Sequence, residues 1–215
     1  MKPAPDRQRH HRRSIRLQGY DYSRSGAYYV TLCTQDRACL FGEIVNGDMQ
    51  VNDAGCMVTD AWYSLPDRFP TIDLDAFVVM PNHVHGIIVI TDDAMPIDDG
   101  DIVGAGLVPA RNVAPARNVA PVRNVVPTNN RATTRVAPTL GDVIGAYKSI
   151  VTVQYARAVK TRGWTSFRKR LWQRNYYEHV IRNADSLNRI RQYILDNPRR
   201  WNEDRYNPTV REAKA

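Results

Sequence analysis

Two histidines one residue apart are the side chains most suited to chemistry in this chain. The stretch "VVMPNHVHGIIVI" (78–90) is apolar on both sides of a Pro-Asn pair and then carries His83 and His85. Side chains alternate across a strand, so the two imidazoles share one face, about 7 Å apart at Cα. Two imidazoles on one face can bind one metal ion. The alternative is that one or both are hydrogen-bonded core or edge histidines, because an HxH pattern alone occurs in many unrelated proteins.

A third metal ligand has to come from elsewhere, because no HExxH, second HxH or DxD lies near the histidines. The last expected helix, "LNRIRQYILDNP", offers one. Leu187, Ile190 and Ile194 form its buried stripe, and at about 100° per residue Tyr193 and Asn197 fall together at the edge of that stripe. The pair occupies the last turn before a proline, where a helix end can meet a sheet.

A tyrosine hydroxyl beside a metal ion is a candidate nucleophile. Its reference pKa of about 10 leaves little phenolate at neutral pH. An ion that polarises a phosphate and stabilises the developing charge lowers the barrier to attack by such a weak nucleophile. The product would be a phosphotyrosine, which keeps the bond energy for a later joining step. The alternative is that Tyr193 is a half-buried helix residue packed on the sheet.

The elements that must position these residues can be predicted from hydrophobic periodicity and turn residues. Removing a repeat segment leaves the order strand, hairpin, helix, strand, strand, helix, strand, helix. One apolar sheet face covered by amphipathic helices buries these stripes, so we expect an α+β fold with one mostly antiparallel sheet and helices packed on a face. The expected ranges are 27–34, 42–52, 52–69, 75–80, 83–91, 139–163, 175–181 and 185–198.

The repeat segment is "LVPARNVAPARNVAPVRNVVP" (107–127), in which a Pro/Arg motif recurs every six residues. Its few large apolar side chains cannot bury a core, so we expect 92–138 to be a flexible, disordered insertion. Its arginines either contact DNA loosely or belong to a passive linker. A basic N-terminal arm (1–19), a single domain (20–91 and 139–202) and a C-terminal tail (203–215) complete the expected organisation.

Positive charge is segregated along the chain, which has a net charge of +8. The arm carries +5, residues 20–100 carry −10, residues 101–138 carry +4 and residues 139–215 carry +9. A basic arm and a basic C-terminal third fit a polyanion such as nucleic acid. No apolar run suits a membrane span or a signal peptide, and the three cysteines form no CxxC pair. We therefore expect a cytoplasmic, nucleoid-associated protein with reduced thiols and no membrane partner.

Three blocks in order, "VVMPNHVHGIIVI", "LWQRNYYEHVIRN" and "RQYILDNPRRW", resemble the single-tyrosine (Y1) HUH-type transposases of the smallest bacterial insertion sequences. They are most similar to the chromosomal relatives of those enzymes, the REP-associated tyrosine transposases. The resemblance covers about residues 20–202 apart from the insertion. It implies a ferredoxin-like HUH sheet and DNA transposition activity on hairpin-forming repeat DNA.

The resemblance also implies roles for individual residues. His83 and His85 match the family's HUH histidines, which hold Mg²⁺ or Mn²⁺. Tyr193 matches the tyrosine that attacks DNA, and Asn197 matches the third ligand, although insertion-sequence relatives often carry Gln there. Tyr176 and Tyr177 are rival nucleophiles, ranked lower because no polar ligand follows either of them four residues later.

Further residues are expected to bind substrate or to support the site. Glu178 and His179 would orient the site or contact substrate, and a structural role is the alternative. A basic and aromatic set fits phosphate contacts and base stacking on single-stranded DNA, although exposed charges around a core tryptophan would give the same pattern. The set comprises Lys148, Arg168, Lys169, Arg170, Trp172 and Arg174, with Tyr176 as a further stacking residue.

The sequence therefore predicts a metal-dependent, single-stranded DNA endonuclease and strand transferase that acts through a 5′-phosphotyrosine, as a monomer or a homodimer. One alternative is a domesticated sequence-specific DNA-binding protein that has lost turnover. Another is a small-substrate metal hydrolase, which leaves the basic C-terminal third unexplained.

Overall fold

The computed structural model describes residues 20–91 and 138–212. The basic arm, nearly all of the predicted insertion (92–137) and the last three residues lie outside the described residues. The predictions made for the arm and the insertion therefore stay predictions. Cys33, Cys39 and Cys56 are all free thiols, as expected. Within the described ranges, no helix is long and apolar enough to cross a membrane.

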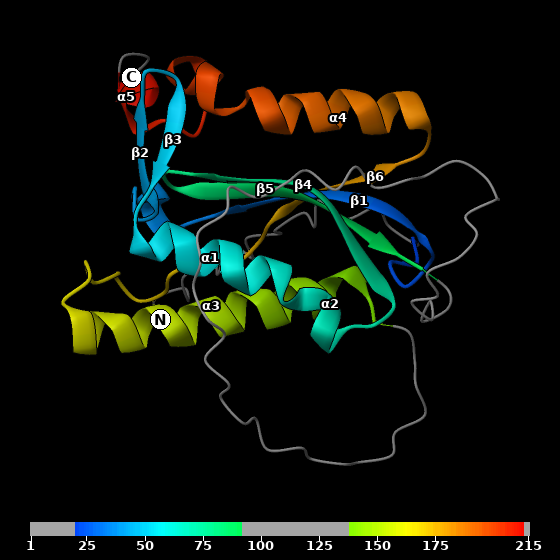
Figure 1. Ribbon diagram of the computed structural model, residues 1–215, viewed down its shortest axis with the longest axis horizontal. Helices are drawn as coiled ribbons and strands as arrows, with labels where there is room; N and C mark the ends of the chain where they lie inside the picture. Colours follow the sequence, from blue (N-terminus) through cyan, green and yellow to red (C-terminus); the bar gives the residue numbers. More distant parts are fainter. Residues whose placement is uncertain (1–19, 92–137, 213–215) are drawn as a thin grey trace, which may run out of the picture.

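A four-stranded antiparallel sheet forms the centre of the molecule (Figure 1). The strand order is β4-β5-β1-β6, so the first strand pairs with the two strands that follow it farthest along the chain. The β4–β5 pair turns tightly at Pro81-Asn82, as the sequence predicts. The strands are β1 (Gly26–Cys33), β4 (Ile72–Met80), β5 (His83–Ile90) and β6 (Tyr177–Ile181).

A separate hairpin consists of β2 (Gly42–Val45) and β3 (Asp48–Val51). Its two-residue turn is Asn46-Gly47, with φ of 53° and 85°. Asn and Gly tolerate this left-handed backbone, which matches the twist of a two-residue hairpin. The Asn-Gly prediction of a tight hairpin is confirmed.

Three helices cover one face of the sheet. Asn52 caps α1 (Asp53–Tyr63) by accepting a hydrogen bond from the Gly55 amide, and a short α2 (Leu65–Arg68) follows with Pro66 in its first turn. The long α3 (Leu140–Arg162) begins at a capping box of Thr139 with Asp142 and ends at Gly163, whose φ is 69°. These caps satisfy backbone groups that a helix end leaves unpaired.

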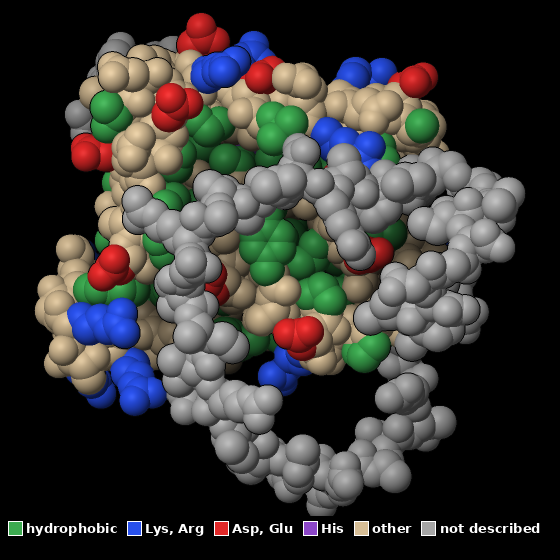
Figure 2. All heavy atoms as spheres, viewed as in Figure 1, with side chains coloured by type: hydrophobic (Ala, Val, Ile, Leu, Met, Phe, Trp, Pro, Cys, Tyr) green, Lys and Arg blue, Asp and Glu red, His purple; other side chains and the backbone are tan. Residues whose placement is uncertain are grey.

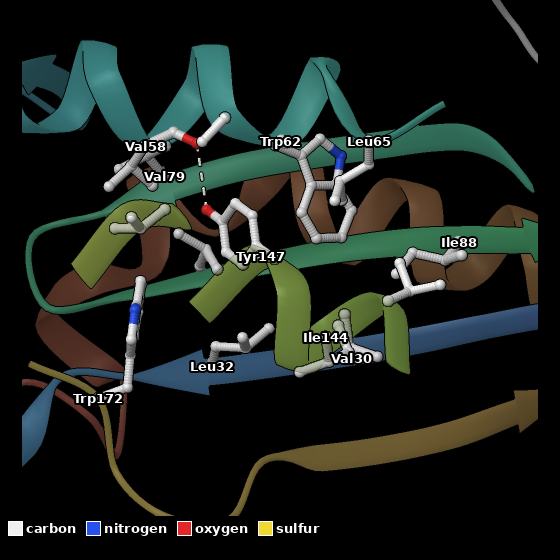
Figure 3. Packing of buried hydrophobic residues seen from close by; sticks show 14 of the residues in the cluster. Val30, Leu32, Val58, Trp62, Leu65, Val79, Ile88, Ile144, Tyr147 and Trp172 are labelled. Atoms are coloured by element: carbon white, nitrogen blue, oxygen red, sulfur yellow. Dashed lines mark hydrogen bonds between the residues drawn. The ribbon is translucent and has the colours of Figure 1, made fainter. Parts of the chain in front are cut away.

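The main core lies between this helix layer and the sheet (Figure 3). Tyr147 of α3 is fully buried, and its hydroxyl donates to the Val58 carbonyl of α1 at 3.1 Å. The Trp62 ring stacks on Phe77 at 4.6 Å and sits directly over Gly86. A Cβ at Gly86 would collide with the indole, so glycine is required by this close approach.

The other face of the sheet is covered by α4 (Ala184–Asp196), so the expectation of helices on a single face is wrong (Figure 1). Leu187 and Ile194 pack on Tyr29 and Ile87. The central strands carry apolar residues on both faces of the sheet, so each face has to be buried under a helix layer. A bidentate ion pair between Arg191 and Asp75, at 2.8 and 2.5 Å, fixes α4 to β4.

Two short 3-10 helices lie at the end of the sheet where β1 ends and β5 begins. One, η1 (Gln35–Arg37), follows β1, and the other, η2 (Pro198–Glu203), continues from α4. The chain then runs through Tyr206 and Asn207, both buried, into α5 (Pro208–Glu212). Within the segment predicted as a C-terminal tail (203–215), these two residues therefore pack against the domain.

Basic side chains lie at several places on the surface. Figure 2 shows some of the Lys and Arg side chains at its lower left, over the end of α3, whose last turn contains Lys160 and Arg162, and others along the top, over α4. The connection from α3 to β6 begins at that end of α3. This connection is joined to the end of β1, because the Gln35 amide donates to the Leu171 carbonyl at 2.7 Å and the Gln173 amide to the Cys33 carbonyl at 2.9 Å.

Candidate metal centre and nucleophile

His83 and His85 open β5 and share the face of the sheet that α4 covers. They pair across the ladder with Cys33 and Thr31 of β1. Both imidazoles are buried, and their Nε2 atoms lie 3.0 Å apart. The predicted shared face is confirmed, and the two nitrogens converge on one point.

The second nitrogen of each imidazole is held by a polar neighbour. His83 Nδ1 lies 2.8 Å from Asn82 Oδ1, and His85 Nδ1 lies 2.7 Å from the Tyr29 hydroxyl and 2.8 Å from Thr31 Oγ1. The Asn82 amide nitrogen donates to two backbone carbonyls, so its oxygen faces the histidine. His83 Nδ1–H therefore donates to Asn82 and Nε2 keeps its lone pair, which is the tautomer that binds a metal.

Burial keeps both imidazoles neutral. Burial is the main cause that lowers the pKa of His83 well below its usual value, and His85, Arg37 and Arg205 lower it further. Burial, with a smaller contribution from Arg205, lowers the pKa of His85 to about 3. Neutral imidazole is the form that coordinates metals, so the pair is ready to act as ligands at ordinary pH.

Asp204 supplies a carboxylate beside the histidines. Its Oδ2 lies 3.7 Å from His83 Nε2, and its Oδ1 accepts from the Tyr206 amide at 2.7 Å. Burial raises the pKa of Asp204, partly offset by that backbone hydrogen bond and by the charges of Arg205 and Arg37. His83, His85 and Asp204 offer ligand atoms within 4.8 Å of one another and could hold a metal ion. The sequence analysis missed Asp204.

Asn197 ends α4 at the junction with η2 and is 3% exposed. Its Oδ1 is buried and accepts no hydrogen bond from the residues that the structure describes. A buried carbonyl oxygen without a donor costs free energy, and a cation would satisfy it. Asn197 therefore remains a candidate ligand beside the three residues of the cluster.

The donor set fits a divalent ion. Neighbouring ligands of an octahedral ion with bonds of about 2.1 Å lie about 3 Å apart, which matches the 3.0 Å between the two Nε2 atoms. Two imidazoles and a carboxylate suit a divalent transition-metal ion better than Mg²⁺, because imidazole is the softer ligand.

Tyr193 lies on α4 next to this cluster. Its ring centroid is 5.5 Å from that of His85 and 6.2 Å from that of Tyr29, and the side chain is 40% exposed. The ring thus packs on the face of the sheet that carries the histidine pair, while part of the side chain is open to solvent. The bidentate pair of Arg191 with Asp75 fixes the helix two residues before it.

The rival tyrosines differ in position. Tyr177 points to the same face of the sheet, 43% exposed, with its ring 6.1 Å from Tyr29. Tyr176 precedes β6 and packs with the main core, under the ammonium of Lys148. Of these two rivals, only Tyr177 lies on the face of the histidine pair.

Glu178 and His179 point to opposite faces of β6. His179 pairs with Tyr29 and shares the face of the histidine pair, where it is exposed. Glu178 pairs with Val30 and faces the main core, where both its carboxylate oxygens are buried. His179 therefore lies on the face of the histidine pair and Glu178 on the face of the main core, and the roles predicted for them stay predictions.

The predicted DNA-binding residues do not form a single group: four of them line a hollow, one lysine bonds to the backbone, and one tryptophan lies in the core. A hollow of about 450 Å³ is lined by Gln35, Asp36 and four of the basic residues. Those four are Arg168, Lys169, Arg170 and Arg174.

Lys148 and Trp172 do not line this hollow. The Lys148 ammonium donates to the Gln173 carbonyl at 2.9 Å, and burial lowers its pKa to about 8. Trp172 is 4% exposed and packs between Phe41 and Tyr147, which favours the alternative of a core tryptophan.

Comparisons with known proteins give one clear relative. An uncharacterized protein of Haemophilus influenzae is 37% identical over 199 residues, which cover 91% of this chain and 92% of that protein. No family model matches.

Two solved structures are weakly similar. A REP-associated tyrosine transposase bound to a REP hairpin has a TM-score of 0.46 at 17% identity, covering 86% of this chain and 73% of that one. A transposase candidate from Deinococcus radiodurans has a TM-score of 0.40 at 16% identity, covering 85% and 97%. Such scores are too low to assign a function, which has to be argued from the side chains of this chain.

Proposed function

We propose that this chain, which belongs to the same family as the Haemophilus influenzae protein, is a metal-dependent single-stranded DNA endonuclease and strand transferase. One observation carries the proposal. Two buried, neutral imidazoles converge at 3.0 Å beside a carboxylate, and an exposed tyrosine packs against one of them. The arrangement combines ligands for a cation with a nucleophile that can reach a phosphodiester.

The topology supports this proposal. Without the hairpin and the helices after β6, the order is strand, helix, strand, strand, helix, strand, which is the ferredoxin-like order. Both intervening helices, α1 and α3, lie on the face away from the histidines. We infer that this is an HUH sheet, in which the face with the histidines is covered by α4 and carries the reaction site.

A divalent ion, Mn²⁺ or Mg²⁺, would be held by His83, His85 and Asp204, with Asn197 as a further ligand. When bound, it would polarise the scissile phosphate and stabilise the charge that develops on it. Asn82 holds His83 in the tautomer that leaves Nε2 free for the ion, and burial excludes water from the edges of both imidazoles.

Tyr193 would then attack the phosphorus. The bond from its Oη to phosphorus forms, the bond from phosphorus to the 3′ oxygen breaks, and the 5′ end stays on the enzyme as a phosphotyrosine. The phenolic proton leaves to solvent and the departing 3′ oxygen takes up a proton, so the step consumes no water. Attack by another 3′ hydroxyl on the phosphotyrosine reverses the step and joins the strands.

The substrate strand would run from the site to the basic connection before β6. Four cations line the hollow, and hydrogen bonds join this connection to the end of β1, whose last residue pairs with His83. Phosphate contacts along such a path position a strand without reading its sequence. Hairpin-forming repeats are the substrate class that the three sequence blocks favour.

The test is a denaturing gel after incubation of a labelled single-stranded hairpin with protein and Mn²⁺. The wild type should give a covalent adduct that Tyr193→Phe abolishes and Tyr177→Phe retains. Replacing His83 and His85 together by Ala should also abolish the adduct while hairpin affinity stays within about tenfold, because phosphate contacts dominate binding.

Two outcomes would change the assignment. An adduct that survives in Tyr193→Phe and disappears in Tyr177→Phe moves the nucleophile to β6. Tight hairpin binding by the wild type without any adduct, over a panel of repeats and metals, would instead identify a DNA-binding protein that has lost turnover.

A further inference from the structure

Two arginines flank Tyr206 next to the candidate metal ligands. The guanidinium carbons of Arg37 and Arg205 lie 5.2 and 4.8 Å from the centre of the Tyr206 ring. That ring is in turn 4.8 Å from the ring of His83 and 6.4 Å from that of His85. Neither arginine belongs to the set predicted to bind DNA, and the sequence blocks end before Arg205.

The backbone of Arg205 is fixed although its side chain is exposed. Arg37 Nη1 donates to the Arg205 carbonyl at 2.5 Å, and both neighbours of Arg205 are packed, Asp204 against His83 and Tyr206 in the protein interior. One guanidinium nitrogen, Nη2, donates to the Tyr206 hydroxyl at 2.8 Å. Arginine has five N–H donors in a planar fork, so most of them can reach a ligand from this position.

The charge of Arg205 acts on every group of the site. It helps to lower the pKa of both His83 and His85, behind the larger effect of burial. The hydrogen bond to the Tyr206 hydroxyl is the main cause that raises the pKa of Arg205, and the nearby Tyr193 and Asp204 side chains raise it further. A guanidinium beside a site for a divalent ion is repulsive, and the single negative charge of Asp204 offsets only part of that repulsion. The arrangement therefore suits an anionic group held by the metal ion and the guanidinium together.

We propose that Arg205 is a catalytic residue that donates hydrogen bonds to the non-bridging oxygens of the scissile phosphodiester, and that Arg37 is a positioning residue that holds it there through the Arg205 carbonyl. The inference rests on the proposed function and adds a residue to it. Arg205 exchanges no proton in the reaction, because its guanidinium stays charged throughout. It stabilises the charge that builds on the phosphate as Tyr193 attacks.

The experiment measures adduct formation in a single turnover with saturating hairpin and Mn²⁺. Arg205→Gln should lower the rate about 10²- to 10³-fold, the usual effect of removing one donor to a developing oxyanion. Arg205→Lys should recover part of this loss, because it restores the charge without the fork. Arg200→Gln is the matched control, because Arg200 is exposed on η2 and the substitution removes the same charge. The rate of this variant should stay near that of the wild type.

Affinity measurements separate a catalytic role from a structural one. Mn²⁺ affinity, measured by calorimetry without DNA, should be unchanged or slightly higher in Arg205→Gln, because a nearby positive charge is removed. Tyr206→Phe keeps the ring and removes only the hydroxyl that Arg205 contacts, and should keep most of the rate. If Arg205→Gln and Tyr206→Phe lose rate and Mn²⁺ affinity equally, Arg205 only supports Tyr206 and the inference is overturned.

Two further results would test the inference and the proposed function separately. Equal rates for Arg205→Gln and Arg200→Gln overturn the inference and leave the proposed function intact. If the wild type forms no adduct, the proposed function fails, and the affinity of the Mn²⁺-loaded protein for a dinucleotide phosphodiester still tests Arg205. Equal affinities of the wild type and Arg205→Gln would then overturn the inference as well.

Discussion

Asn197 gives a direct test of whether the site is built for a cation, through stability and not through activity. Its Oδ1 is buried without a donor among the described residues. An unsatisfied buried polar group costs about 1–3 kcal/mol. Asn197→Leu replaces the amide by an apolar group of similar size, so in EDTA the variant should be as stable as the wild type or more stable by up to about 1–3 kcal/mol.

Metal should reverse this order. A ligand that binds only the folded state adds about 2.7 kcal/mol at a concentration 100 times its dissociation constant. The wild type should therefore gain stability in Mn²⁺, and Asn197→Leu should gain less because one ligand is missing. Urea unfolding curves of both proteins in EDTA and in Mn²⁺ measure the two differences.

Asn207→Leu is the matched control. Asn207 is also buried, but its amide donates to the Trp201 carbonyl and accepts from the Thr209 amide and hydroxyl. Losing three hydrogen bonds should cost roughly 2–4 kcal/mol in EDTA and in Mn²⁺ alike. If Asn197→Leu loses stability in EDTA as Asn207→Leu does, and gains from Mn²⁺ as much as the wild type, Asn197 is a structural residue and the reasoning is refuted.

Three further predictions concern the frame around the site. Gly86→Ala should destabilise the protein by about 1–3 kcal/mol or more in thermal unfolding, because the new methyl group meets Trp62, and an unchanged melting temperature would contradict this packing. Arg191→Lys should slow adduct formation more than it weakens hairpin binding, because the bidentate contact with Asp75 that fixes α4 is lost; equal effects on both would argue against a positioning role. Burial lowers the pKa of Lys148 to about 8, so the folded protein releases this proton before the unfolded chain does, and the stability of the wild type relative to Lys148→Met should rise between about pH 8 and 10. A constant difference over that range would show that Lys148 keeps an ordinary pKa.

Local sequence patterns predicted the helices, strands and turns well, because each of them is determined by residues that are close in the sequence. The Asn46-Gly47 turn, the cap at Asn52 and the stripe of α3 depend on neighbours within a few residues. The second helix layer was missed although the strands carried a signal for it. "AYYVTLCT" and "HVHGIIVI" are apolar at consecutive positions, as expected for strands that are covered on both faces.

No local sequence pattern marks the site residues that were not predicted. Asp204 and Arg205 follow η2, whose path is set by packing against the sheet and not by any periodicity of the segment. Trp172 lies between elements and becomes a core residue because a single bridge to Thr34 brings its segment onto β1. Residue types and spacing therefore located the histidines and the tyrosine, while the carboxylate and the guanidinium depended on the tertiary fold.

The candidate ligands come from three segments of the chain. His83 and His85 lie on β5, Asn197 at the end of α4, and Asp204 after η2. An ion bound to all of them would tie the helix that carries Tyr193 to the strand beneath it. Without an ion, the same groups leave a buried oxygen without a donor and two imidazole nitrogens facing each other at 3.0 Å. Metal binding would therefore stabilise the C-terminal segment and fix the nucleophile at once, which links the stability of this region to its reactivity.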